Sequence, residues 1–206
     1  MRGFRQLLAT VLFSTVLAIS GGAFAQDYDL VILNGRVMDP ETNFDMVRNV
    51  GVKDGKIAVI TKEAITGAET IDASGHVVAP GFIDGHVHVV DAPLGQKAAL
   101  RDGVTTALDL EVGAHPVDRW YDGMAGRSQT NYGASASAVG ARVNVFNPAY
   151  DSETGGTGLD MFTGKITSAD YVVRRATEIE RDQILEYVEN GLKAGALGIG
   201  PPTVSY

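Results

Sequence analysis

Apolar and polar positions alternate over short segments in the first part of the chain, a pattern typical of β-strands. Two apolar segments, residues 50–53 and 56–60, flank the dipeptide Asp54-Gly55. Both residues of this dipeptide tolerate a positive φ, so the dipeptide favours a two-residue hairpin turn. No helical period appears in residues 26–80, which we therefore expect to form a small β-sandwich domain.

Turn-forming residues divide the same region into further strands. Asn34-Gly35 separates the apolar residues 30–33 from residues 36–38, and Ala73-Ser74-Gly75 precedes Val77-Val78. Asparagine and glycine accept the backbone angles that tight turns need. We therefore predict that the chain turns at both places.

Strands and helices alternate after Pro80. The predicted segments are a buried strand over residues 81–88, a helix over 94–101, a strand over 104–110, a helix over 117–124 and strand-like structure within 131–145. Such an alternation favours parallel βα units, in which each helix returns the chain to the same edge of the sheet.

The most clearly marked helix begins near Thr177. Thr177 and Glu180 fit a capping box, in which the side chain of each residue accepts a hydrogen bond from the backbone N–H of the other residue. An apolar stripe follows at helical spacing, formed by Ile184, Leu185, Val188 and Leu192. Gly195 stands where a helix C-cap glycine belongs. Residues 196–199 then predict a short buried strand.

The number of residues limits how much of a barrel the chain can contain. A closed (β/α)8 barrel of the TIM type needs about 250 residues, and residues 81–206 are far fewer. We therefore predict an α/β fold: a TIM-like barrel truncated to its first βα units and preceded by the β-sandwich.

Composition and charge narrow the function classes. The formal net charge is −8, and an acidic surface repels phosphate backbones, so we expect no nucleic-acid partner. The chain contains no cysteine, which excludes disulfides and cysteine-based zinc sites. The oligomeric state stays open.

Residues 1–25 have the pattern of a secretory signal peptide. Arg2 and Arg5 precede an apolar run over residues 7–19, and Ala23-Phe24-Ala25 places small residues at the cleavage positions. The alternative is an uncleaved membrane anchor, but the run is shorter than the roughly 20 residues that a membrane span needs. We expect cleavage after Ala25 and a periplasmic or secreted protein with no membrane association.

His86 and His88 are the first candidate metal ligands. They are two residues apart on a predicted strand, so both imidazoles project to one side while Val87 points away. Two neutral imidazoles at the carboxyl end of a barrel strand are suited to a divalent ion such as zinc. The spacing alone also fits a surface histidine and a chance neighbour.

The context of the two histidines resembles a known family. The run Val78-Ala79-Pro80-Gly81-Phe82-Ile83-Asp84-Gly85-His86-Val87-His88 is similar to the first-strand signature of the amidohydrolase superfamily. Residues 28–37 and 54–57 resemble the N-terminal β-domain of that family. The resemblance implies that His86 and His88 are the first two metal ligands.

Glu111 is the candidate third ligand. The segment Gly103–Glu111 resembles the next strand of the family, and alternation along it puts Asp109 and Glu111 on one face. Members place a metal-bridging group at this strand end: a carboxylated lysine in many, a cysteine in D-aminoacylases, a glutamate in some deaminases. This chain has neither cysteine nor a lysine there, so Glu111 would bridge. Asp109 fits a supporting role, and a solvated loop carboxylate remains the alternative for Glu111.

Other polar residues are weaker candidates. His115 lies in a loop at the same end of the predicted barrel, His76 lies in a turn of the β-domain, and Asp84 is expected to support the junction before the histidines. The tail from Gly195 resembles the N-acyl-D-amino-acid deacylase branch, where a similar strand leads to a substrate-binding tyrosine. Tyr206 would be that tyrosine.

The resemblance implies hydrolysis of a carbon–nitrogen amide bond, other than a peptide bond, by water activated on one or two zinc-like ions. Family members add two histidines and a catalytic aspartate from later strands. No histidine follows His115, so the general base is expected beyond Tyr206 and the 206 residues alone are expected to be inactive.

The expected substrate is a small amide, most specifically an N-acyl-D-amino acid such as N-acyl-D-glutamate. A cyclic-amide hydrolase of the dihydroorotase or hydantoinase type shares the same first strand and stays open as an alternative. A secreted, metal-free binding module is the non-enzymatic alternative.

Overall fold

The computed structural model describes residues 27–88, 90–152, 155–156, 160 and 174–200. The expected signal peptide and Tyr206 lie outside these residues. The chain divides into two compact units, residues 1–79 and 80–206. The division falls at Pro80, where the sequence pattern changes from β-strands to alternating strands and helices.

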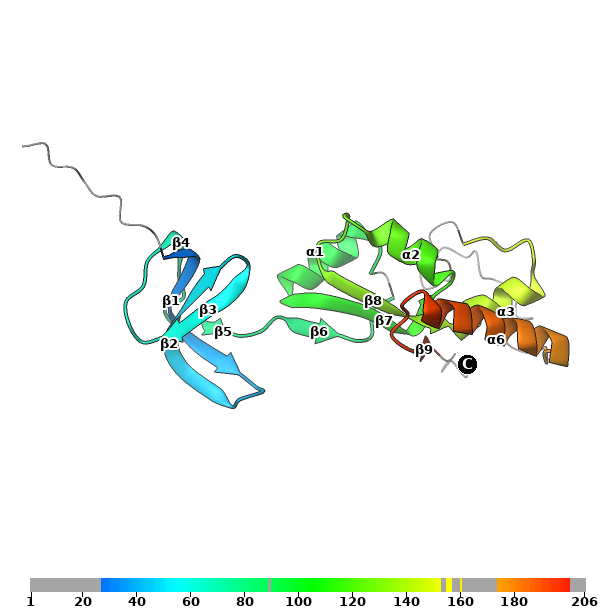
Figure 1. Ribbon diagram of the computed structural model, residues 1–206, viewed down its shortest axis with the longest axis horizontal. Helices are drawn as coiled ribbons and strands as arrows, with labels where there is room; N and C mark the ends of the chain where they lie inside the picture. Colours follow the sequence, from blue (N-terminus) through cyan, green and yellow to red (C-terminus); the bar gives the residue numbers. More distant parts are fainter. Residues whose placement is uncertain (1–26, 89, 153–154, 157–159, 161–173, 201–206) are drawn as a thin grey trace, which may run out of the picture. The chain divides into compact units, whose positions relative to one another are not determined.

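The first unit is a five-stranded sheet (Figure 1). Its strands are β1 (Tyr28–Asp39), β2 (Phe44–Lys53), β3 (Lys56–Thr61), β4 (Gly67–Asp72) and β5 (Val77–Val78). The order is β3-β2-β1-β4, and β5 pairs with the second half of β1. The predicted hairpin is confirmed: Asp54 and Gly55 have φ of 50° and 70° and join β2 to β3.

The turn predicted at Asn34-Gly35 is wrong, because β1 runs through it as one strand. The pairing of β1 with β2 shifts between Ile32 and Gly35, and Asn34 has a φ of 63°. Asn34-Gly35 is therefore a bulge inside a strand. A Cβ on Gly35 would lie 2.5 Å from Val78 Cγ2, so this glycine lets β5 approach.

The bulge divides β1 into two halves with different neighbours. The first half pairs with β4 and the second half with β5, on the side away from β2. Val31, Val37, Val50 and Ala73 are buried in this unit. Among the described residues the unit is thus one sheet, and a second, facing sheet of the expected sandwich is not seen there.

The second unit has α/β architecture, as expected for the first βα units of a (β/α)8 barrel. Its elements are β6 (Phe82–Asp84), α1 (Pro93–Arg101), β7 (Val104–Ala114), α2 (Val117–Met124), β8 (Asn131–Ser137), α3 (Ala138–Phe146), α6 (Glu178–Lys193) and β9 (Ile199–Gly200). The four strands pair in the order β6-β7-β8-β9, and every pairing is parallel.

One local prediction for this unit is confirmed in part and another is wrong. The strand-like structure expected within residues 131–145 is β8, and helix α3 follows it. Ser137 starts this helix by accepting a hydrogen bond from Gly140 N at 3.0 Å, the N-cap role of a serine. The strand expected to be buried before the histidines is the short β6, in which Phe82 and Ile83 are 67% and 71% exposed. Within the described residues β6 pairs with β7 alone, so nothing covers it from the other edge.

The core of this unit lies between the sheet and its helices. Trp120 and Met124 of α2 are buried together with Ala134 and Ala136 of β8. The predicted capping box at the start of α6 is confirmed. From α6, Val188 joins the core, whereas Leu185 and Leu192 of the predicted stripe are 54% and 40% exposed.

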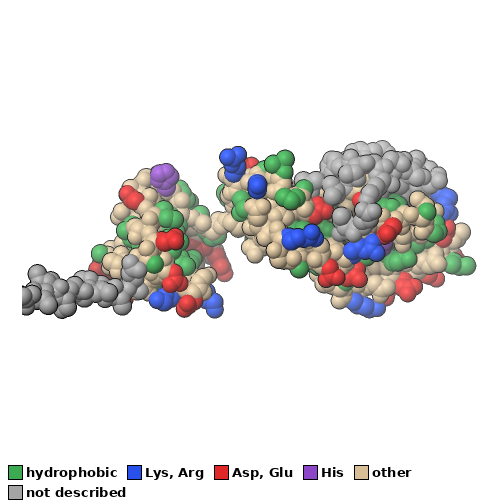
Figure 2. All heavy atoms as spheres, turned by 90° about the horizontal axis from the view of Figure 1, so that it is seen from above, with side chains coloured by type: hydrophobic (Ala, Val, Ile, Leu, Met, Phe, Trp, Pro, Cys, Tyr) green, Lys and Arg blue, Asp and Glu red, His purple; other side chains and the backbone are tan. Residues whose placement is uncertain are grey.

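The surface carries charges of both signs. Figure 2 shows Lys and Arg side chains interspersed with Asp and Glu on the visible face of each unit. No helix among the described residues is long and apolar enough to cross a membrane.

Candidate metal centre

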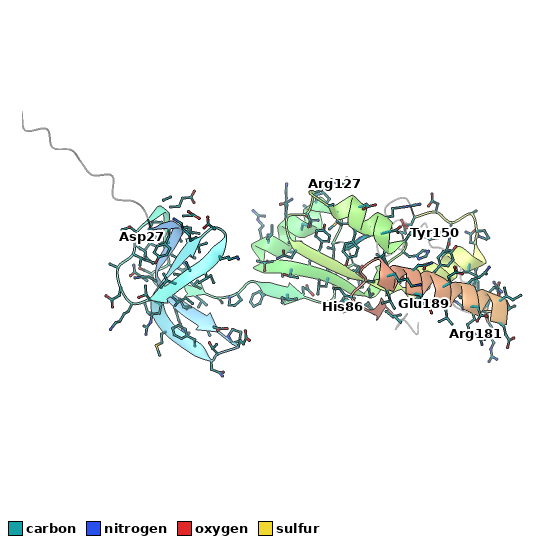
Figure 3. The ribbon with its side chains drawn as sticks, viewed as in Figure 1. Asp27, His86, Arg127, Tyr150, Arg181 and Glu189 are labelled. Atoms are coloured by element: carbon teal, nitrogen blue, oxygen red, sulfur yellow. The ribbon has the colours of Figure 1, made fainter. Side chains whose placement is uncertain are left out.

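His86 stands just past the end of β6 (Figure 3). Asp84 Oδ1 accepts a hydrogen bond from the backbone N–H of His86 at 3.0 Å. The next residue, Val87, donates its backbone N–H to Leu108 O of β7 at 3.2 Å. The first hydrogen bond fixes the turn of the chain before the histidines, and the second holds this segment against β7. The structure confirms that Asp84 supports this junction.

The side chains of His86, His88 and Glu111 converge. His86 Nε2 lies 2.9 Å from Glu111 Oε2, and His88 Nε2 lies 3.1 Å from the same oxygen. The two Nε2 atoms are 3.0 Å apart. Two nitrogens and one carboxylate oxygen therefore form a nearly equilateral triangle, brought together from two strands more than twenty residues apart in sequence.

This donor set fits a divalent cation. Four ligands at about 2.0–2.1 Å around a tetrahedral zinc ion lie roughly 3.3 Å from one another, close to the separations in the triangle. Imidazole nitrogen and carboxylate oxygen are both common zinc ligands. The side chain of His86 is 66% exposed, against 25% for His88 and 29% for Glu111. The group is thus accessible to solvent at His86, and three protein ligands leave a further coordination position for water or substrate.

Asp109 lies on the other side of the His88 ring. Its Oδ1 is 3.7 Å from His88 Nδ1 and accepts a hydrogen bond from Gly113 N at 2.8 Å. The residue is almost fully buried, and burial raises the pKa of its carboxyl to about 6. This separation is longer than a hydrogen bond, and it places Asp109 beside the His88 ring, where the sequence predicted a supporting carboxylate.

The local course of β7 differs from the predicted alternation. The structure buries Ala107 and Asp109, whereas Leu110, from the face expected to meet the helices, is 37% exposed. The register of β7 against β8 shifts between Asp109 and Ala114. Glu111 therefore reaches the histidines from an irregular segment, which a strict period of two does not describe.

The remaining candidate histidines are elsewhere. His115 is 6% exposed, its ring contacts that of Tyr187 on α6, and burial lowers its pKa to about 4. It is not part of the group formed by His86, His88 and Glu111. His76 is exposed and its Nδ1 lies 3.0 Å from Ser74 O in the first unit.

The sequence did not single out two buried residues that support the centre. Gln96 Nε2 donates to Val90 O at 2.7 Å and its Oε1 accepts from Gln129 N at 2.8 Å. This side chain fixes the backbone two residues after His88. Ser135 donates to a carbonyl of β7 beside the centre. A glutamine in a short helix and a serine in a strand carry no sequence pattern that distinguishes them from solvent-exposed ones.

Comparisons with known proteins agree with the geometry. A family model described as "Amidohydrolase family" matches residues 69–184, more than half of the chain. The match includes both histidines, Glu111 and most of the second unit.

Two curated relatives are dihydroorotases. The one from Streptococcus pneumoniae is 49% identical over 88 residues, which cover 38% of this chain and 21% of the relative. The one from Solibacter usitatus is 30% identical over 184 residues, covering 78% of this chain and 41% of the relative. The chain thus spans less than half the length of the curated relatives it matches.

A solved structure has a similar fold. It is the N-acyl-D-glutamate deacylase from Bordetella bronchiseptica, crystallised with zinc and a phosphonate inhibitor. The TM-score is 0.59 at 23% identity, and the match covers 84% of this chain and 38% of the deacylase.

Proposed function

This chain belongs to the amidohydrolase family, and we propose that His86, His88 and Glu111 hold a divalent metal ion, most specifically zinc, for the hydrolysis of a carbon–nitrogen amide bond. The observation that carries the proposal is the triangle of two imidazole nitrogens and one carboxylate oxygen, with sides of 2.9, 3.0 and 3.1 Å.

Each of these residues would have a different role at such a centre. A bound divalent cation lowers the pKa of a coordinated water to about 7 and polarises the carbonyl of the substrate. His86 and His88 would hold the ion through their Nε2 atoms, and Asp109 would act beside the Nδ1 atom of His88. Glu111 supplies a negative charge that offsets part of the charge of the cation. The exposed side of His86 would allow the substrate to reach the centre.

For the substrate we propose an N-acyl-D-amino acid, such as N-acyl-D-glutamate. The fold similarity to the deacylase extends over 84% of the chain, through both units. The sequence from Gly195 onward, which resembles that branch, supports the same substrate class, with Tyr206 as a substrate-binding residue.

A cyclic-amide hydrolase of the dihydroorotase type is the second candidate. The 49% identity to a dihydroorotase favours it, although that match covers 38% of the chain. A cyclic amide and an acyl amide would present the same kind of carbonyl to a metal ion held by these residues, so such a centre would serve either substrate.

We also propose that the protein is exported to the periplasm or secreted. The positively charged, apolar and small-residue segments of residues 1–25 support the proposal.

Metal content tests the proposed centre. We expect the purified chain to contain one or two zinc ions per molecule by mass spectrometry of the metals, and the double variant His86→Ala/His88→Ala to contain none, because both nitrogen ligands are removed. His76→Ala is the matched control, since His76 is exposed in the first unit. Equal zinc in the double variant and the control would refute the assignment.

Activity distinguishes the substrate classes. The protein at its full natural length is incubated with N-acyl-D-glutamate and, separately, with dihydroorotate and a hydantoin. Turnover of the first alone supports the deacylase, and turnover of a cyclic amide alone supports the second candidate. Turnover by protein that contains no metal would exclude both metal-dependent candidates.

A further inference from the structure

The strand that carries Glu111 leaves the regular ladder just before this residue. The register pairs on either side of the irregularity are Asp109 with Ala134 and Ala114 with Ala136. Four residues of β7, 110–113, therefore lie opposite a single residue of β8, Ser135. The irregularity is a large bulge, and Glu111 is its second residue.

A bulge removes ladder partners from its backbone groups, and Ser135 replaces one of them. Its Oγ donates to Leu110 O at 2.9 Å and lies 3.5 Å from Asp109 O. Ser135 is 2% exposed, so no water competes for its hydroxyl at this position. A buried carbonyl without a partner is costly. The hydroxyl thus satisfies the carbonyl group that is bonded directly to the backbone nitrogen of Glu111.

The surroundings of Ser135 leave the bulge little room to move. Gly113 has a φ of +74°, and a Cβ on it would lie 2.4 Å from Ser135 O. A Cβ on Gly200 of β9 would lie 2.4 Å from Ser135 Oγ and 2.6 Å from Glu111 O. Two glycines therefore allow the backbones of β7 and β9 to pack directly around this serine, at the position where Glu111 leaves the sheet.

We propose that Ser135 is a positioning residue of the metal centre: its hydroxyl holds the bulge of β7 in the form that brings Glu111 Oε2 to the two histidines. The inference rests on the proposed function. Groups that orient a metal ligand without touching the metal typically contribute about 10- to 100-fold to metal affinity. Loss of the hydroxyl should therefore weaken zinc binding by at least about tenfold.

Ser137 offers a matched control on the same strand. It is 1% exposed, but its Oγ accepts from Gly140 N and starts α3. Ser135→Ala and Ser137→Ala thus remove the same atom from equally buried sites two residues apart. We expect Ser137→Ala to lower the melting temperature by roughly 2–4 °C through the lost cap and to leave the zinc affinity unchanged.

The test measures zinc affinity by competition with a chromophoric chelator, together with the melting temperature of the metal-free chain and the visible spectrum of the Co²⁺-loaded chain. The variants are Ser135→Ala, Ser137→Ala and Glu111→Gln. Only Ser135→Ala and Glu111→Gln should lower the affinity and change the Co²⁺ spectrum. Ser135→Gly removes the same hydroxyl without adding a group that could bind zinc; it should show the same loss of affinity and serves if the alanine variant fails to fold.

The outcomes separate the two proposals. Zinc binding by Ser135→Ala within twofold of the unsubstituted chain, or an equal loss in Ser137→Ala, would overturn the positioning role while Glu111→Gln still showed the site to be real. Unchanged binding in Glu111→Gln would instead refute Glu111 as a ligand, and the role of Ser135 with it.

Discussion

His115 shows how much the environment of a single residue changes its chemistry. It follows β7 and is 6% exposed, with its ring against Tyr187 and its backbone N–H bonded to Gly155 O. Burial lowers the pKa of the imidazole from 6.5 to about 4, although Asn144 acts in the opposite direction. The residue is therefore neutral in the folded protein at every pH above about 4.

This shift predicts a specific dependence of stability on pH. The stability due to a neutral His115 is fully present above pH 6.5, the pKa in the unfolded chain, and is lost as the pH falls toward 4, because only the unfolded state takes up the proton. The loss amounts to about 3 kcal/mol. We expect His115→Gln to lose less stability than the unsubstituted chain between pH 7 and pH 4, by about this amount.

Urea denaturation of the metal-free chain at both pH values measures the difference. The exposed His76→Gln is the control and should behave like the unsubstituted chain. An unchanged pH dependence in His115→Gln would contradict the burial of His115 as a neutral group.

At the scale of elements, α6 is the segment whose start the sequence predicted best. Thr177 Oγ1 accepts from Glu180 N, and Glu180 Oε2 accepts from Thr177 N. Arg174 pairs with Glu180 as well, and this pair, together with Thr177, lowers the pKa of the Glu180 carboxyl to about 2. The capping box could be predicted from the sequence because all the residues that form it lie within six positions of one another. The same helix contributes Val188 and Gly191 to the packing of the second unit.

Removal of the cap should destabilise the second unit modestly. We expect Thr177→Ala to lower the free energy of unfolding by about 1 kcal/mol, because a backbone N–H in the first turn of α6 loses its acceptor. Thr177→Ser keeps the hydroxyl and should be nearly neutral. Chemical denaturation of both variants measures the effect, and equal stabilities would show that the cap contributes nothing in solution.

At the scale of the whole molecule, the proposed export depends on residues 1–25. Without them the formal charge changes from −8 to −10, because this segment contains Arg2 and Arg5 and no acidic residue. The acidic, cysteine-free chain needs no disulfide to fold in an oxidising compartment.

The export proposal predicts a processed N-terminus. The protein recovered from the periplasm or medium should begin at Gln26, as measured by intact mass. Ala25→Leu should keep residues 1–25 attached, because the cleavage site requires a small residue there. An unprocessed, cytoplasmic product of the unsubstituted sequence would contradict the proposal.

The sequence by itself determined the features that depend on neighbours within a few residues. These are the Asp54-Gly55 hairpin, the helix over 117–124, the start of α6 and the pair of histidines after β6. Backbone preferences, capping and side-chain periods act over such short distances. The local sequence is therefore enough to predict them. The alternation of strand and helix patterns predicted the α/β class, and the resemblance to the family extended the candidate site to Glu111.

Only the tertiary structure decided what depends on strands meeting. The burial of His115 and the bulge opposite Ser135 both result from contacts between segments distant in sequence. Asn34-Gly35 is a bulge in the pairing of β1 with β2, and β5, more than forty residues later, packs against Gly35. The physical reason is the same in each case. Burial and register are properties of two segments packed together, and the sequence of one segment does not specify which other segment it will pack against.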